Sequence, residues 1–218
     1  MHKDLKDVPE RILEVAIGAL TQANTHSVFY DPGMEHRDHM CIINAALAGE
    51  LFLKAIIAKE HPLLIFRDLF QLDDPSNKDL KIAHIIEKGR TYNFEHLPQL
   101  LWVSTGERLP DVQSFEKLRK ARNAIQHFCS PPRGGLRRIA LEFLYKNIDP
   151  LIKKHFDLFA IEHHEDEFYD YVVRCLISHE LMFSVPKDFS LSEIDLDEEL
   201  NDCSPAYKKK LMRRIETA

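Results

Sequence analysis

Side chains that bind phosphate or transfer protons gather in one short segment near the middle of the chain. Arg119, Arg122, Asn123, Gln126 and His127 recur at offsets of 0, 3, 4, 7 and 8 residues, which is the spacing of one helical face. A guanidinium matches phosphate oxygens with a planar fork of donors. An imidazole, whose pKa lies near neutrality, acts as a general acid or base. Together they suit RNA cleavage without a metal: a 2′-hydroxyl loses its proton, attacks the adjacent phosphorus, and the arginine stabilises the developing charge.

A single helix is predicted to position these side chains. It begins after Pro110, with Asp111 as its N-cap, and ends near Phe128, ahead of Pro131-Pro132. His127 then lies in the last turn, where the helix dipole favours the imidazolium by roughly 0.3–1 kcal/mol. The apolar face is expected to comprise Leu118, Ala121, Ile125 and Phe128, and Val112 and Phe115 point the same way as the polar stripe. We therefore expect the stripe to face a groove or an interface; the alternative is a solvated helix surface.

Helical periodicity recurs along the rest of the chain, and strand alternation is nearly absent. The predicted helices lie at 12–23, 37–60, 63–72, 78–88, 94–103, 136–148, 149–160 and 168–179, followed by a basic terminal helix. Asp149-Pro150 is expected either to kink a helix or to begin a new one. Gly is scarce, at 7 residues, as is usual where helix predominates. The sequence therefore predicts an all-α protein.

The motif helix resembles the signature of HEPN domains, an arginine followed by a polar residue and, some residues later, a histidine. Arg122, Asn123 and His127 match it within Leu118–Phe128. The Ala-rich run around Glu50 resembles the second helix of this family, and residues 95–100 resemble its approach to the motif helix. The resemblance covers about residues 5–160.

This resemblance implies an antiparallel helical bundle that forms a homodimer, in which two motif helices meet and build a composite site. Many members are metal-independent endoribonucleases of toxin–antitoxin, antiviral or RNA-processing systems. By carry-over, His127 is the acid or base, Arg122 binds phosphate and Asn123 positions them, while Arg119 and Gln126 support the site. Glu50 would contact the motif; alternatively it forms an i, i+4 pair with Lys54. Arg119 is equally compatible with a surface charge.

The domain organisation and partners follow from the same resemblance. We expect a HEPN-like domain at 5–160 and a helical extension at 161–218, packed on it or mediating partner or dimer contacts. RNA is the expected partner, with a cognate antitoxin or a nucleotidyltransferase-type protein as a further one. Two other functions stay open: a non-catalytic HEPN module that binds a protein or nucleotide, and an RNA-binding scaffold that uses its basic patches alone.

Composition and motif content bear on which ligands the protein binds and where in the cell it is found. The net charge of −6 argues against a globally basic nucleic-acid binder, yet residues 115–140 hold seven basic side chains against Glu116 alone, and residues 193–202 hold six acidic ones. No nucleotide-binding fingerprint appears, and neither the four cysteines nor the pairs His36/His39 and His163/His164 have metal-site spacing. We expect no cofactor and no metal. Without a signal-peptide core or an apolar run long enough to cross a membrane, the expected location is the cytoplasm.

Overall fold

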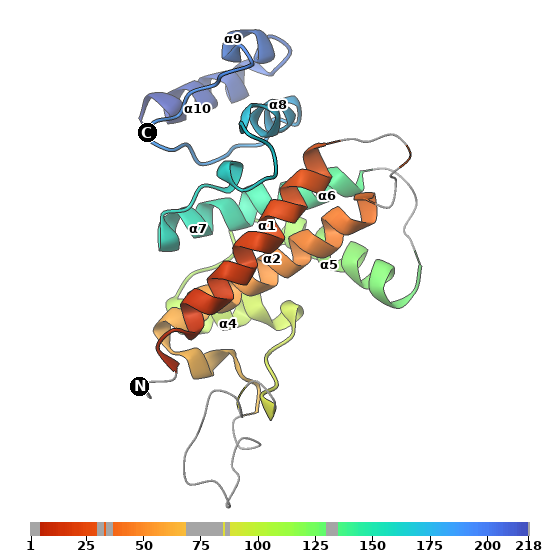
Figure 1. Cartoon of the computed structure of the whole chain (residues 1–218), viewed down its shortest axis with the longest axis vertical. Helices are drawn as coiled ribbons and strands as arrows, with labels where there is room; N and C mark the ends of the chain where they lie inside the picture. The colour runs from red at the N-terminus through yellow and green to blue at the C-terminus, as the bar shows by residue number, and fades with distance from the viewer. Residues whose placement is uncertain are drawn as a thin grey trace, which may run out of the picture. The chain divides into compact units, whose positions relative to one another are not determined.

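The computed structural model describes residues 5–29, 33, 37–68, 85, 88–129 and 135–217. It divides into two compact units, one made of residues 1–16 and 50–109 and the other of residues 17–49 and 110–218. Helices α1 (Val8–Val28) and α2 (Arg37–Glu60) each contribute one part to each unit (Figure 1). Within the described residues the protein is all-α, and its one β feature is an isolated antiparallel bridge between Phe66 and Thr91.

The first unit combines the second part of α2 with two 3₁₀ helices, η2 (Pro62–Ile65) and η4 (Phe94–His96), and with α4 (Leu97–Thr105). His61 caps η2, because its Nδ1 accepts a hydrogen bond from the Leu63 N–H at 3.2 Å. Helix α4 ends at Gly106, whose φ of 78° suits a glycine. The large side chains that are fully buried in the first unit are Phe52, Leu53, Ile56, Ile57, Leu97 and Leu101.

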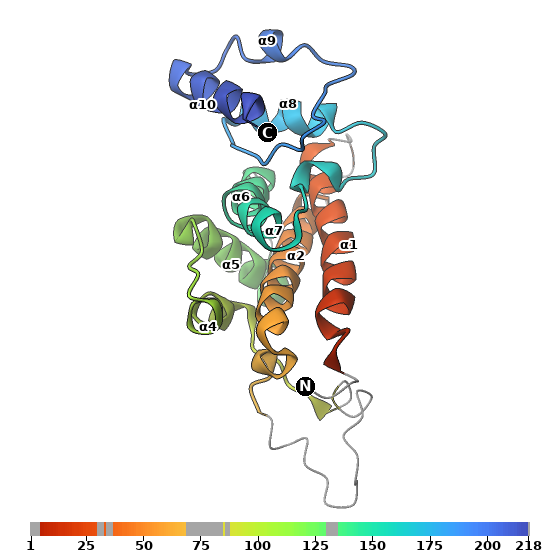
Figure 2. The same ribbon diagram turned by 90° about the vertical axis from the view of Figure 1, so that its left-hand side faces the viewer.

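The second unit holds the motif helix and everything after it. Its elements are α5 (Val112–His127), α6 (Leu136–Phe143), the π-helix η5 (Leu144–Ile148), α7 (Asp149–Phe156), the 3₁₀ helix η6 (Ala160–Glu162), α8 (Asp170–Ser178), α9 (Leu196–Glu199) and α10 (Pro205–Glu216). Helix α5 lies beside α6, and α8, α9 and α10 gather at the C-terminal end of this unit (Figures 1 and 2). Leu20, Ile42, Leu118, Leu141, Phe143 and Phe183 are fully buried in it.

Buried polar side chains tie the segments of this unit together. Asn24 on α1 donates from Nδ2 to the carbonyls of Ala160 (2.8 Å) and His163 (2.9 Å), and its Oδ1 accepts from the Tyr145 hydroxyl at 3.1 Å. Asp149 accepts from the N–H groups of Ala160 (3.3 Å) and Ser184 (2.7 Å). These bonds hold the chain after α7 against α1 and α7, since buried polar groups are costly without partners.

Most helix predictions are confirmed, with local corrections. Residues 37–60 form one helix, and the motif helix runs from Val112 to His127 behind an Asp111 cap. Asp149-Pro150 begins a new helix, but the prediction that it continues to about residue 160 is wrong. Helix α7 ends at Phe156, because Asp157 adopts a left-handed φ of 56°.

Two predicted short helices are only partly testable. The one at 63–72 is a 3₁₀ turn at Pro62–Ile65 followed by extended Phe66, and its remainder from residue 69 lies outside the described residues. The helix at 78–88 also lies outside them except for Ile85 and Lys88, as does the stop at Pro131-Pro132.

Helix α2 is long and apolar enough to cross a membrane by length and composition, with a mean hydropathy of 1.8 over 18 residues. The prediction that no apolar run reaches this length is therefore wrong. In the structure 67% of that window is buried, and a core helix passes the same test.

Candidate functional site

Helix α5 is anchored at its beginning and open at its end. Asp111 Oδ1 accepts a hydrogen bond from the Ser114 N–H at 3.0 Å, which is the N-cap that the sequence predicts. Ser114, Phe115, Leu118 and Ala121 are buried along the first three turns of the helix, whereas Gln126 and His127 are exposed at its end. The packing therefore fixes the helix through its first three turns and leaves the last turn accessible.

The three predicted catalytic residues lie in the second half of α5. Arg122 and Asn123 are half-buried, and Arg122 Nη1 donates a hydrogen bond to Asn123 Oδ1 at 3.2 Å. This contact restrains one edge of the guanidinium and leaves its other donors for a ligand. His127 is exposed, and its imidazole makes no hydrogen bond or ion pair with another residue that the structure describes. Its imidazole is thus accessible to a substrate.

Of the two predicted supporting residues on α5, Arg119 is less available to a substrate than Arg122, because it already has a charged partner. Arg119 forms a short ion pair with Glu116, whose Oε2 lies 2.8 Å from Arg119 Nη2, and the arginine side chain is 26% exposed. This hydrogen bond, opposed by a little desolvation, lowers the pKa of Glu116. Arg119 therefore has a structural partner within one helical turn. Gln126 lies exposed beside His127.

Glu50 belongs to the other compact unit, where it forms the i, i+4 pair with Lys54. The Lys54 ammonium lies 2.6 Å from Glu50 Oε1 and donates a second bond to the Thr91 hydroxyl at 2.9 Å. The Lys54 side chain is 8% exposed and that of Glu50 is 22% exposed. A buried ammonium group is costly without a charged partner, and Glu50 provides that partner for Lys54. The role of Glu50 toward the motif stays a prediction.

The expected apolar face of α5 holds for Leu118 and Ala121 but not for Phe128. Phe128 is 89% exposed, because the backbone leaves the helix there with φ −138° and ψ −77°. Val112 is 58% exposed, whereas Phe115, predicted to point with the polar stripe, is buried with its ring 6.3 Å from that of Phe143. The last turn consequently exposes an aromatic ring next to His127.

No protein-family model, curated protein or solved structure matches this chain. Its function must therefore be argued from its own residues. Among the described residues, no group of three or more His, Cys, Asp or Glu side chains is placed to hold a metal ion.

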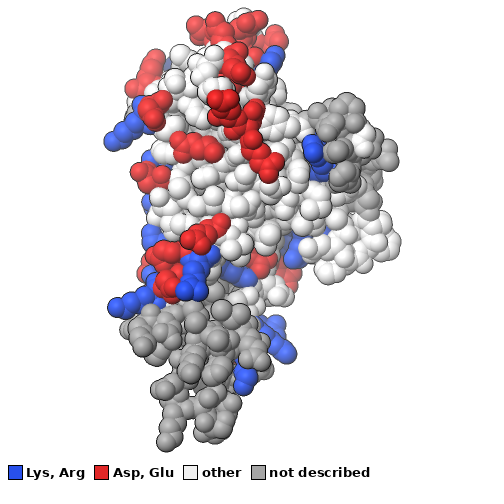
Figure 3. Space-filling view, in the orientation of Figure 1, with Lys and Arg blue, Asp and Glu red and all other residues white. Residues whose placement is uncertain are grey.

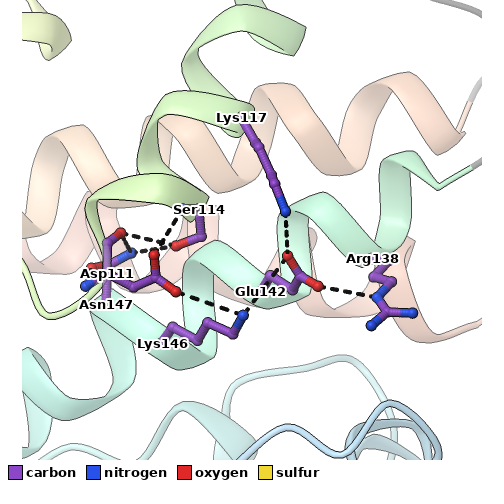
Figure 4. Close-up of polar contacts among 7 residues, drawn as sticks. All are labelled: Asp111, Ser114, Lys117, Arg138, Glu142, Lys146 and Asn147. Atoms are coloured by element: carbon purple, nitrogen blue, oxygen red, sulfur yellow. Dashed lines mark hydrogen bonds and ion pairs between the residues drawn. The ribbon is translucent and has the colours of Figure 1, made fainter.

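A second polar cluster, which the sequence did not single out, lies between α5 and α6 (Figure 4). Glu142, only 12% exposed, faces Arg138 at 3.0 Å, Lys117 at 3.5 Å and Lys146 at 3.9 Å. Burial by itself raises the pKa of Glu142, but the hydrogen bond from Arg138 and the charges of the two lysines outweigh it and lower that pKa overall. The spacing of Arg138, Glu142 and Lys146 at i, i+4 was the available signal.

Asn147 completes the anchor of α5 from the π-helix. This fully buried side chain accepts from the Asp111 N–H at 2.8 Å and donates to the Asp111 carbonyl at 2.9 Å and the Ser114 hydroxyl at 2.8 Å (Figure 4). One amide thereby satisfies three polar groups at the start of the motif helix. These three bonds hold the start of α5 against the π-helix, and no sequence motif marks Asn147.

Proposed function

We propose that this protein is a metal-independent endoribonuclease with a HEPN-like helical bundle, cutting RNA at a site shared by two copies of the chain. The main support for this proposal is the arrangement at the end of α5. There the accessible His127 follows Arg122 by just over one turn, and the guanidinium of Arg122 is hydrogen-bonded to Asn123. An imidazole and a guanidinium supply proton transfer and charge stabilisation, which is what attack by a 2′-hydroxyl requires.

Helix geometry supports the need for two copies. Arg122 and His127 are five positions apart in sequence, so the two side chains leave α5 about 140° apart and about 7.5 Å apart along its axis. One phosphate is poorly placed to contact both side chains of the same helix. Two motif helices facing each other would bring Arg122 of one copy toward His127 of the other.

The proposed reaction proceeds in one displacement. His127 takes the proton of a 2′-hydroxyl, whose oxygen forms a bond to the adjacent phosphorus. The bond from phosphorus to the 5′-oxygen breaks, and that oxygen takes up a proton from the imidazolium of the second copy or from water. Arg122 stabilises the negative charge that builds on the phosphoryl oxygens. The products are a 2′,3′-cyclic phosphate and a 5′-hydroxyl.

The test is cleavage of total RNA in EDTA by wild type, Arg122→Ala and His127→Ala, with the product ends identified. We expect wild type alone to cut and to leave 2′,3′-cyclic phosphates. His96→Ala is the matched control, because His96 is also exposed, with a 52% exposed side chain, and should leave cleavage unchanged. Equal cleavage by all four proteins, or its disappearance in EDTA, would refute the assignment. Sedimentation of the wild type checks for the dimer.

The second candidate is a non-catalytic module that binds a protein partner, such as a cognate antitoxin. The exposure of Phe128 favours it, because aromatic side chains are enriched at protein interfaces. If RNA stays intact with wild type, Phe128→Ser should disrupt partner capture while His127→Ala should not.

A further inference from the structure

Cations from four elements of the second unit form a connected row that the proposed reaction does not use. Lys117 on α5, Arg138 on α6 and Lys146 on the π-helix surround Glu142, and their side chains are 59%, 59% and 40% exposed. Lys146 also lines a hollow of about 420 Å³ together with Lys210 and Arg214 of α10. We call these five residues the basic track.

The carboxylates along the basic track are occupied by bonds to the fold. Asp149 accepts from the N–H groups of Ala160 and Ser184, and Glu180 accepts from the Ser204 N–H at 2.6 Å and the Ser204 hydroxyl at 3.0 Å. Asp111 caps α5 and lies 3.6 Å from the Lys146 ammonium. The carboxylate oxygens that line the hollow therefore already accept hydrogen bonds from the protein itself.

The cations keep donors for a ligand. Lys210 is exposed, and its ammonium group forms no hydrogen bond or ion pair with the residues that the structure describes. Arg214 donates from Nη1 to the Phe183 carbonyl at 2.9 Å, which leaves its other guanidinium edge. The hollow therefore offers N–H donors to an anion more readily than acceptors to a cation.

We propose that the basic track binds the phosphate backbone of single-stranded RNA and leads it to the end of α5. This inference rests on the proposed function for the identity of the polyanion. Exposed Lys120 connects the track to the site, because it precedes His127 by seven residues. The two side chains are therefore about 10 Å apart along the axis and within about 20° of the same direction. Successive phosphates would contact Lys210 or Arg214, Lys146, Lys117 and Lys120 before reaching His127.

The acidic surface nearby makes such a track necessary for RNA binding. On the face shown in Figure 3, carboxylates gather over the region of α8, α9 and α10, which includes the acidic stretch from Glu193 to Asp202. A chain of phosphates is repelled by this face. Binding by a protein of net charge −6 therefore requires a localised row of cations.

The experiment measures binding of a short 2′-O-methyl oligoribonucleotide, which cannot be cut, at several salt concentrations. We compare wild type with Lys210→Gln/Arg214→Gln. The control is Lys209→Gln/Arg213→Gln, because these residues have the same charge and i, i+4 spacing on the same helix, are exposed, and do not line the hollow. A second pair, Lys117→Gln/Lys146→Gln, leaves the Arg214–Phe183 bond intact in case that bond is needed for folding.

Loss of two phosphate contacts to a single strand should lower the slope of log affinity against log salt by about 1.4. It should also weaken binding roughly 25-fold at about 0.1 M salt. We expect this for both track variants and little change for the control. The inference would be overturned if the track and control variants lost the same affinity for the oligoribonucleotide, or if neither lost any. It would also be overturned if the wild type did not bind. A wild type that binds through the track but leaves ordinary RNA uncut would refute only the proposed nuclease.

Discussion

Replacement of Asn147 by alanine should loosen the motif helix at its start. The variant removes three hydrogen bonds, to the Asp111 N–H, the Asp111 carbonyl and the Ser114 hydroxyl, at a site with no solvent exposure. At about 1 kcal/mol of net stability for each bond, the loss is roughly 3 kcal/mol. The part-buried Asp111 amide left without a partner adds to this, so we expect a total of roughly 3–4 kcal/mol.

The assay is urea unfolding of wild type, Asn147→Ala and Asn44→Ala. Asn44 is the matched control, because among the described residues its side chain forms one hydrogen bond, with His26 Nδ1 at 3.3 Å, and the loss of that bond should cost about 1 kcal/mol. The unfolding midpoint should fall in proportion to the number of bonds, while the slope with urea stays the same. Hydrogen exchange at Ser114 and its neighbours should quicken selectively in Asn147→Ala. A loss below about 1 kcal/mol, or one equal to that of the control, would show that Asn147 does not anchor α5.

Two further predictions concern carboxylates. Burial raises the pKa of Asp149 to about 6 from its ordinary 3.8, against the lowering effects of its bonds to Ser184 and Ala160 and of Arg214. The folded protein therefore keeps this proton where the unfolded chain has lost it, so the contribution to stability is largest below about pH 4 and falls by about 3 kcal/mol as the pH rises past 6. Unfolding of wild type and Asp149→Asn at pH 4 and pH 7 checks this, and a constant difference between them would contradict it. Glu50→Gln should cost about 3 kcal/mol, because the buried Lys54 ammonium loses its charged partner, while RNA cleavage per folded molecule stays unchanged. Lost cleavage at full stability would instead place Glu50 with the motif.

Local sequence patterns were enough to predict helices α2 and α5. The cap at Asp111 and the long apolar run of α2 depend on neighbours in sequence, and the structure reproduces both. The end of α7 was mispredicted because Asp157 in a left-handed conformation is a local choice that periodicity does not reveal.

The sequence singled out the residues of the candidate site, whose role stays a proposal, but it did not predict their surroundings. Spacing along one helix identified Arg122, Asn123 and His127 as a group. It could not show that Phe128 leaves the apolar face, because that depends on where the last turn unwinds. Asn147 and Glu142 escaped notice because their partners on α5 and its cap are more than 20 residues away in sequence. Such contacts exist only once α5 packs on α6.

The π-helix at Leu144–Ile148 gives this region an unusual sensitivity to chain length. A π-turn is an α-turn with one additional residue. A deletion of one residue there would remove this additional residue, and it would turn every side chain on one side of the deletion by about 100° relative to the other. Glu142 could then no longer meet Lys117 while Asn147 still meets Asp111, since the π-turn lies between Glu142 and Asn147. A single codon therefore sets the rotational register between α6 and the residue that anchors the start of the motif helix.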